Sequence, residues 1–203
     1  MDRKQHWDTV YTSKAETEVS WFQDNPATSL ALIEQAAIGL DAAVVDIGGG
    51  ASRLVDALLA RQYRSISVLD IAVDALAKSK ARLGAQAADV TWIVADITRW
   101  QPPQQYALWH DRAVFHFLTD PADRLAYRTA LLAGTAAGNR IIIASFALDG
   151  PERCSGLPVM RYAPETLQAE LGTPFVLTDS RHEEHRTPGG GVQRFQYSCF
   201  IRT

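Results

Sequence analysis

The chain is poor in the residues that mark several large classes of protein. Only two of its 203 residues are cysteines, and neither Cys154 nor Cys199 belongs to a C-x-x-C pair or lies near a histidine at metal-ligand spacing. Two cysteines are too few for a disulfide framework, so we expect both to be buried or free thiols. This cysteine pattern also gives no reason to expect a metal site.

Long apolar runs and clusters of basic residues are missing as well. No stretch approaches the roughly 20 apolar residues of a membrane-spanning helix, and the polar start MDRKQHW has no apolar signal-peptide core. With a net charge of −3 and no Lys/Arg run, the chain shows no electrostatic footprint for nucleic acid. We therefore expect a cytoplasmic protein, monomer or homodimer, that binds neither membranes nor nucleic acid.

What is present begins with a glycine-rich turn. Residues 44–53 read VVDIGGGASR, in which an apolar strand passes through Asp46 into three glycines that open a helix. Because glycine has no Cβ, a ligand can lie against this backbone and meet the free N–H groups of the helix. The dinucleotide fingerprint G-x-G-x-x-G has a third glycine where this chain has Arg53, and a carboxylate at Asp46 would repel phosphate. The turn favours a cofactor with hydrogen-bond donors or positive charge.

Apolar strand patterns alternate with helical patterns along the chain, which is typical of a parallel sheet covered on both faces. At 203 residues and 47% hydrophobic composition, the chain can bury one full core, so we expect a single domain. Besides the strand that starts at Val44, the patterns predict strands at 66–70, 90–97, 106–111, 140–146, 175–181 and 193–202. They predict helices at 28–38, 52–61, 73–83, 121–133 and 164–171.

The segment from Asp46 to Gly50, followed by a small residue, resembles the first motif of class I S-adenosylmethionine-dependent methyltransferases. Two later strands end in acids that fit the same family: Asp70, 20 residues after Gly50, and Asp96 in the sequence Ala-Asp-Ile. In that family, the glycine loop wraps the methionyl part of the donor. The second acid binds the ribose hydroxyls, and the third accepts from the adenine amino group. The resemblance implies S-adenosylmethionine as cofactor, S-adenosylhomocysteine as product, and no metal.

The resemblance also implies a fold: a doubly wound α/β architecture with helices on both faces of a mostly parallel seven-stranded sheet. The expected strand order is 3-2-1-4-5-7-6, with strand 7 antiparallel. A His-Trp-Asp pattern and a Trp-Phe pair near the N-terminus resemble segments that cover the donor in some small methyltransferases. Residues 1–27 are therefore expected to form a lid or a hydrophobic strap, with the two readings left open, over a Rossmann-like core at 28–203. The expected cofactor-binding residues are Asp46, Gly48, Gly49, Gly50, Asp70, Ile71, Asp96, Ile97, Asp111, Trp21 and Phe22.

The acceptor side of the site carries fewer signals. Guanidinium groups bind carboxylates in a bidentate manner, which makes the arginines of the later loops candidates for an anionic acceptor. The sequence leaves open whether a catalytic base exists, because proximity and orientation supply much of the rate in many such enzymes. The residues considered as general acid or base are His116, Asp111 and His185. Those considered for substrate binding are Tyr11, Arg112, Arg161, Tyr162, His185 and Arg186.

Together these patterns predict an enzyme that moves a methyl group from S-adenosylmethionine to a small molecule with an oxygen, sulfur or nitrogen nucleophile, by direct SN2 attack. The Asn/Asp-Pro-Pro-Tyr pattern of nucleobase and glutamine methyltransferases is missing. A protein lysine methyltransferase, with a protein substrate as partner, is the alternative within the same fold. A non-catalytic donor-binding protein and a nicotinamide-dependent oxidoreductase are alternatives of other classes, and Arg53 with Asp46 disfavours the last.

Overall fold

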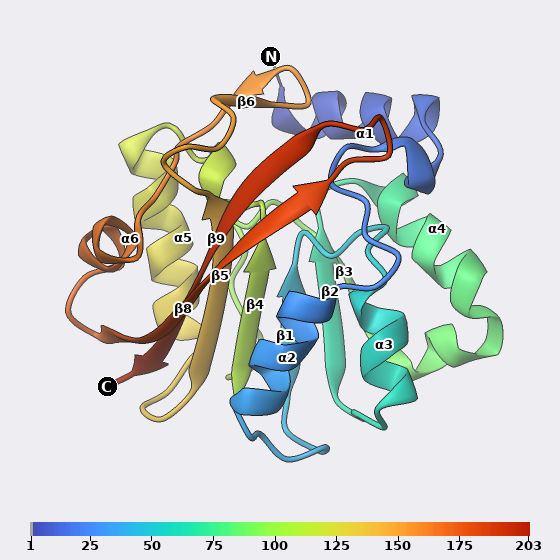
Figure 1. The fold of residues 1–203 in the computed structure, drawn as a ribbon. Helices are drawn as coiled ribbons and strands as arrows, with labels where there is room; N and C mark the ends of the chain where they lie inside the picture. The colour runs from blue at the N-terminus through green and yellow to red at the C-terminus, as the bar shows by residue number, and fades with distance from the viewer. Residues whose placement is uncertain (1) are drawn as a thin grey trace.

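In a computed structural model that describes residues 2–203, one seven-stranded sheet crosses the molecule between two layers of helices (Figure 1). The strand order is β3-β2-β1-β4-β5-β9-β8; neighbours from β3 to β5 are parallel, and β9 is antiparallel to β5 and β8. Numbered within this sheet, the order is 3-2-1-4-5-7-6 with strand 7 antiparallel, so the predicted fold is confirmed. The strands are β1 Val44–Ile47, β2 Ile66–Asp70, β3 Val90–Val94, β4 Leu108–Arg112, β5 Arg140–Phe146, β8 Phe175–Arg186 and β9 Val192–Arg202, with a separate small hairpin of β6 Arg153–Cys154 and β7 Leu157–Pro158.

Alternate side chains of the central strands pack into two hydrophobic cores, one on each face of the sheet. Val44 and Ile142 belong to the core under α2 and α3, whereas Val45 and Ile143 belong to the core under α5 and α6. This is the period-two alternation of a strand, applied to strands that are covered on both faces. The helices are α1 Arg3–Ser13, α2 Ala27–Gln35, α3 Leu54–Ala60, α4 Val73–Leu83, α5 Pro121–Ala133 and α6 Pro164–Leu171, with 3₁₀ turns η1 Glu16–Glu18, η2 Gly84–Asp89 and η3 Phe115–Phe117.

Three strands end at other places than their sequence patterns predict, and the smallest difference is in β4, which ends at Arg112 rather than at residue 111. β3 ends at Val94 rather than at residue 97, because the side chain of Asp96 accepts from the backbone N–H of Thr98 at 2.9 Å and turns the chain. β8 continues to Arg186 rather than stopping at residue 181, because its polar end pairs with β9 up to Val192. Residues 182–186 are therefore an edge strand and not a loop.

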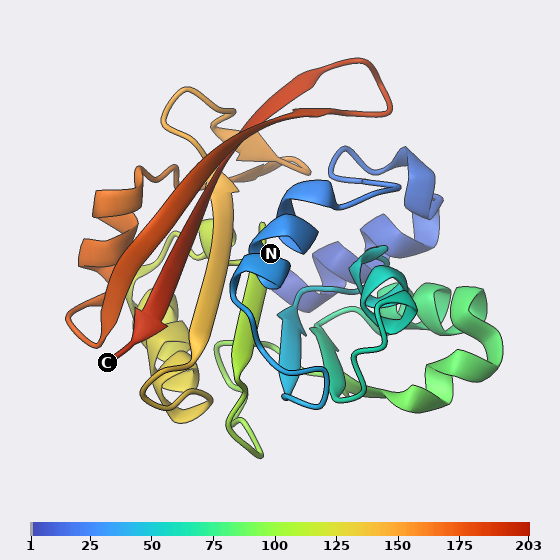
Figure 2. The same cartoon turned by 60° about the horizontal axis from the view of Figure 1, so that its bottom comes forward.

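The long β8–β9 hairpin reaches past the other strands and bends over the N-terminal segment (Figure 2). The Nε2 of His185 donates to the backbone oxygen of Ser20 at 2.7 Å, and the amide of Gln23 donates to Glu183 at 2.9 Å. These contacts fix the segment between η1 and α2 beside the sheet.

Helix α1 lies across the end of the sheet to which the parallel strands point (Figure 1). Asp2 caps its first turn by accepting from the N–H of Lys4 at 3.0 Å. No helix in the described residues 2–203 has the length and hydropathy that a membrane crossing requires. The carboxyl ends of β1, β2, β3 and β4 thus meet beneath α1, which is where open α/β sheets bind ligands.

Candidate functional site

The glycine turn after β1 is packed directly against two carboxylates. Gly48 has a φ of +68°, and the N–H groups of Gly48 and Gly49 donate to the backbone oxygen of Leu69, at 2.7 and 3.2 Å. A Cβ on Gly49 would overlap the carboxylate of Asp46, and one on Gly50 would overlap that of Asp70. Glycine is required here because the backbone takes a left-handed conformation and approaches acidic side chains closely.

Asp46, His110 and Ser29 form a buried chain of hydrogen bonds that the sequence patterns did not indicate. Oδ1 of Asp46 lies 2.7 Å from Nδ1 of His110, and Nε2 of the same ring lies 2.9 Å from Oγ of Ser29. All three residues are at most 3% exposed. Asp46 and His110 are direct partners in the β1–β4 ladder, and α2 brings Ser29 over the same face. The histidine therefore fixes the orientation of the Asp46 carboxylate.

Asp70 ends β2 and is 6% exposed. Its Oδ1 accepts from the N–H of Ala72 at 2.8 Å. Burial raises the pKa of Asp70 to about 7; the neighbouring charge of Asp46 adds to this, and nearby backbone N–H groups oppose it. Keeping this buried carboxylate ionised costs free energy in the free protein. A ligand that donates hydrogen bonds to it would stabilise the ionised form.

Asp96 lies in the turn after β3 and is more accessible. Besides the N–H of Thr98, its Oδ1 accepts from the hydroxyl of Thr98 at 2.8 Å. Its Oδ2 is 3.3 Å from Nη1 of Arg3, whose guanidinium also pairs with Asp123 on α5. Helix α1 is thereby tied to two other elements at the edge of the site.

Two adjoining cavities occupy the space beneath α1. The strand-end cavity encloses about 710 Å³, part of it open to solvent, and Asp70, Ile71, Asp96 and Ile97 line one side of it. The glycine-loop cavity encloses about 570 Å³ and is lined by Asp46, Gly48, Gly49, Phe22, Ser29 and His110. Gly48, Tyr11, Trp21 and Arg112 line both cavities, so they form one continuous site.

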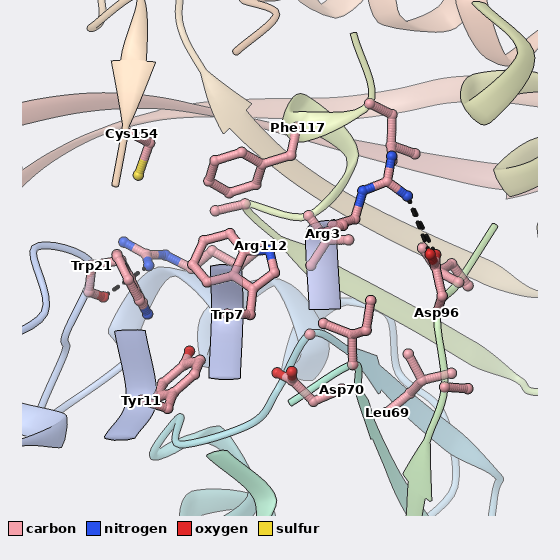
Figure 3. Close-up of a pocket in the computed structure, with 17 residues that line it drawn as sticks. Arg3, Trp7, Tyr11, Trp21, Leu69, Asp70, Asp96, Arg112, Phe117 and Cys154 are labelled. Atoms are coloured by element: carbon pink, nitrogen blue, oxygen red, sulfur yellow. Dashed lines mark hydrogen bonds and ion pairs between the residues drawn. The ribbon is translucent and has the colours of Figure 1, made fainter. Parts of the chain in front are cut away.

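Aromatic side chains from the N-terminal segment cover this site (Figure 3). The ring centroid of Trp7 lies 5.7 Å from that of Trp21 and 5.0 Å from that of Phe117, both nearly edge to face. Tyr11 is buried and lies 6.2 Å from Trp21, and burial, with the charge of Asp70 next, raises the pKa of its hydroxyl above the usual value. Such pairs add stability beyond the apolar area that they bury.

Arg112, at the end of β4, has its guanidinium fixed between the two cavities. Its Nε donates to the hydroxyl of Tyr197 at 2.9 Å and its Nη1 to the backbone oxygen of Trp21 at 3.1 Å. Its Nη2 is 3.4 Å from Glu183, and the guanidinium lies over the ring of Phe195 at 4.3 Å. Of the residues considered for the acceptor, Tyr11 and Arg112 line the cavities.

The other residues considered for the acceptor lie elsewhere. Arg161 donates to the backbone oxygen of Gly150 and to Glu152. Tyr162 is buried in the core under α5 and α6. His185 and Arg186 line an open hollow between the hairpin and residues 17–25, and burial lowers the pKa of His185. The structure does not bring these four residues to the cavities.

Asp111 and His116 are also outside the cavities. Asp111 points to the opposite face of β4 from His110, where it accepts from Tyr127 at 2.7 Å and from the N–H groups of Val114 and Phe115. Burial raises its pKa to about 6. His116 is fully buried, packs on Phe117 and Phe146, and burial lowers its pKa to about 3. Neither side chain has access to a bound ligand in this arrangement, and both serve the core.

The segment that carries the glycine turn is similar in sequence to a known family. Residues 44–132 match a sequence family described as a methyltransferase domain. By this match the segment is similar to a methyltransferase domain. It runs from β1 to α5 and contains the glycine turn and all three strand-end acids. A search among curated protein sequences gave no significant match.

Solved methyltransferase structures share the fold of the whole chain. A SAM-dependent methyltransferase from Anabaena variabilis has a TM-score of 0.78 at 11% identity, covering 100% of this chain and 96% of that one. The N-methyltransferase NodS from Bradyrhizobium japonicum, solved with S-adenosyl-L-homocysteine, has a TM-score of 0.72 at 14% identity and covers 96% and 97%. The 1,6-didemethyltoxoflavin-N1-methyltransferase of Burkholderia thailandensis has a TM-score of 0.66 at 18% identity and covers 98% and 84%. At these identities the likeness establishes the fold.

Several residues of the site were not singled out from the sequence. His110 could have been found, because strand alternation puts it on the face opposite Asp111. Arg3 and Phe117 had no local signal, since they reach the site through contacts with residues distant in the chain. Residues 2–203 contain no group of three His, Cys, Asp or Glu side chains that could hold a metal ion.

Proposed function

We propose that this chain binds S-adenosylmethionine in the joined cavities and transfers its methyl group to a small-molecule acceptor. The observation that carries the proposal is the convergence of Asp46, Asp70 and Asp96, from three consecutive strand ends, around a glycine turn that leaves no room for a Cβ. Each of the three carboxylates can accept a hydrogen bond from a different part of the ligand: the methionyl ammonium, the ribose hydroxyls or the adenine amino group. The carboxylates also suit a ligand that carries positive charge.

The residues divide between the parts of the donor. Asp70 is assigned to the ribose hydroxyls, because its buried carboxylate lines the strand-end cavity and hydroxyl donors would stabilise its ionised form. Asp96, with Ile71 and Ile97 beside it, is assigned to the adenine. Asp46, oriented by His110, and the glycine turn are assigned to the methionyl ammonium and its surroundings.

When bound, S-adenosylmethionine supplies a methyl group on a sulfonium, which the lone pair of an acceptor attacks as the carbon–sulfur bond breaks and its electrons stay on sulfur. The chain's own part is to orient the two molecules and exclude water. Trp7, Tyr11 and Trp21 cover the site, and a dry site strengthens the electrostatic terms that favour loss of the sulfonium charge. We propose accordingly that residues 1–27 act as a lid on a core at 28–203; Met1 lies outside the described residues.

The first test is isothermal calorimetry with S-adenosylmethionine, S-adenosylhomocysteine and NAD. We expect both donor compounds to bind and NAD not to bind. Asp70→Asn should weaken binding about 10- to 100-fold, because a hydrogen bond to a charged group contributes ~1.5–3 kcal/mol. Asp89→Asn is the matched control, because Asp89 is exposed and lines neither cavity.

The outcome separates the alternatives. Binding of NAD without S-adenosylhomocysteine would contradict the proposal and favour an oxidoreductase. If the donor binds, transfer of labelled methyl to a cell extract separated by size distinguishes the acceptors: label in the small-molecule fraction supports the proposal, label in protein indicates a protein methyltransferase, and no label in any fraction indicates a non-catalytic donor-binding protein.

A further inference from the structure

The side of the strand-end cavity away from Asp96 is not needed for the proposed donor. It is lined by Trp7, Tyr11, Trp21, Phe117, Arg112 and Cys154 (Figure 3). Helix α1 contributes Trp7 and Tyr11, whereas Arg112 and Phe117 come from the end of β4 and the turn η3 after it. An acceptor must lie on this side, because the donor's adenosine fills the side with the acids. This inference rests on the proposed function.

The walls of this part of the cavity are mostly aromatic. Trp7 meets Phe117 at 5.0 Å and Trp21 at 5.7 Å between ring centroids, with interplanar angles of 78° and 84°. Tyr11 and Trp21 meet at 78°. Rings held edge to face by one another form a rigid apolar wall, which favours a flat apolar ligand.

The charge that this part of the cavity presents is positive. The guanidinium of Arg112 has five N–H donors. Within residues 2–203 it makes one hydrogen bond each to Tyr197, Trp21 and Glu183, and the last of these is long at 3.4 Å. Glu183 also accepts from Gln23 and does not line the cavity. Burial, followed by the charge of Arg112, lowers the pKa of both His116 and His185.

Acidic side chains line only the donor side. Among the described residues, Asp70 and Asp96 are the carboxylates of the strand-end cavity, and both are assigned to the donor. An ammonium group placed beside Arg112 would find no carboxylate in the lining of the cavity on that side, and it would meet a like charge at low dielectric, which is unfavourable. An anionic group there would gain a charge-assisted and bidentate partner.

We propose that the methyl acceptor is a flat aromatic or heteroaromatic molecule that carries an anionic group, with its ring against Trp7, Trp21 and Phe117 and its negative charge at Arg112. The methyl group passes to an oxygen or nitrogen of this anion: the new bond takes the lone pair of that atom, and the carbon–sulfur electrons remain on sulfur. An acceptor that is already deprotonated needs no general base. This agrees with the positions of Asp111, His116 and His185 outside the cavities.

The test uses three probes of nearly equal shape, 4-fluorobenzoate, 4-fluorobenzamide and 4-fluorobenzylammonium, titrated by ¹⁹F NMR into protein saturated with S-adenosylhomocysteine. We expect the benzoate to bind about tenfold or more tightly than the amide, which is the effect of one charge-assisted interaction, and the ammonium probe to bind most weakly. Equal or tighter binding of the ammonium probe would overturn the proposal. So would the absence of binding by all three probes.

Two variants locate the binding determinants. Arg112→Gln should remove the preference for the benzoate over the amide, while Trp7→Ala should weaken both probes by a similar factor because it removes apolar wall and no charge. Arg64→Gln is the matched control, since Arg64 is exposed and pairs with Asp41 away from the cavities. A preference for benzoate that survives in Arg112→Gln would overturn the assignment. If S-adenosylhomocysteine itself fails to bind wild-type protein, the proposed function fails before the acceptor is tested.

Discussion

Asp70 shows how a single residue links the burial of the site to its use. Burial raises its pKa to about 7, above the 3.8 of an ordinary aspartate. Because the folded-state pKa is the higher one, the contribution of Asp70 to stability is fully present below pH 3.8 and is lost as pH rises through about 7. The free protein therefore keeps an ionised Asp70 at a cost, which a ligand with hydroxyl donors offsets.

Binding of S-adenosylhomocysteine should consequently depend on pH. We expect its affinity to increase as pH rises through about 7 and to be nearly constant once Asp70 is fully ionised. Between one pH unit above and one below the pKa, the affinity should change about tenfold. Calorimetry across this range measures it, and Asp70→Asn should give a flat profile. A wild-type profile without this rise would show that the ionised form of Asp70 is not the one that binds.

The sequence identifies the acidic residues of the site, but it does not show directly to which face of the sheet each side chain points. Asp46, Asp70 and Asp96 follow a recognisable pattern, and the structure brings them to adjoining cavities. Asp111 and His110 are neighbours in β4, and only the side-chain alternation of the strand places one in the site and the other in the opposite core. The His-Trp-Asp pattern pointed to Trp7 through the family resemblance, whereas Arg3 depends on long-range packing of α1, for which a local pattern carries no information.

Among the elements, the turn between β1 and α3 joins backbone shape most directly to ligand binding. A Cβ on Gly50 would lie 2.7 Å from the Cβ of Ala75, in addition to its overlap with Asp70. A methyl group at this position would therefore displace α4, the Asp70 carboxylate or the turn itself.

Gly50→Ala should displace Asp70 and weaken S-adenosylhomocysteine binding by about tenfold or more, with a loss of ~1–3 kcal/mol in the free energy of unfolding from overpacking. Calorimetry and urea unfolding measure the two effects. Gly39→Ala is the control, because Gly39 has no heavy atom within 4 Å of an added Cβ. Unchanged affinity in Gly50→Ala would show that the turn does not hold the ligand.

Four elements have the boundaries that their apolar faces predict, whereas α2, expected at 28–38, spans Ala27–Gln35, and α3, expected at 52–61, spans Leu54–Ala60. α4 at 73–83, β5 at 140–146, α5 at 121–133 and α6 at 164–171 begin and end where the periodicity places them. The end of β8 was not predictable, since its last residues are polar and gain their conformation from hydrogen bonds to β9. An edge strand with two polar faces has the composition of a loop.

For the molecule as a whole, ligand binding should appear as added stability. A ligand that binds only the folded state at 100 times its Kd adds ~2.7 kcal/mol, which raises the Tm of a chain of this size by about 5–10 °C. Thermal unfolding with S-adenosylhomocysteine, against NAD as the control, measures the shift. A shift with NAD, or none with S-adenosylhomocysteine at this concentration, would contradict the donor assignment.

The order of the sheet was expected from the resemblance to class I methyltransferases, and the alternation of strand and helix patterns agrees with it, because parallel strands joined by helices have few allowed arrangements. The final antiparallel hairpin followed from two strand patterns separated by a glycine-rich turn. The order of the elements does not predict how α1 packs over the site. That packing depends on contacts between Arg3 and the distant residues Asp96 and Asp123.

That packing has a consequence for how the protein is made. Arg3 pairs with Asp96 and Asp123, which follow it by 93 and 120 residues. Because chains are synthesised from the N-terminus, α1 emerges before its anchoring partners, which appear only after β3 and the start of α5 have been added. The helix that covers the cavities is thus synthesised before the residues that hold it, so a growing chain has no finished cavity until the start of α5 has been made.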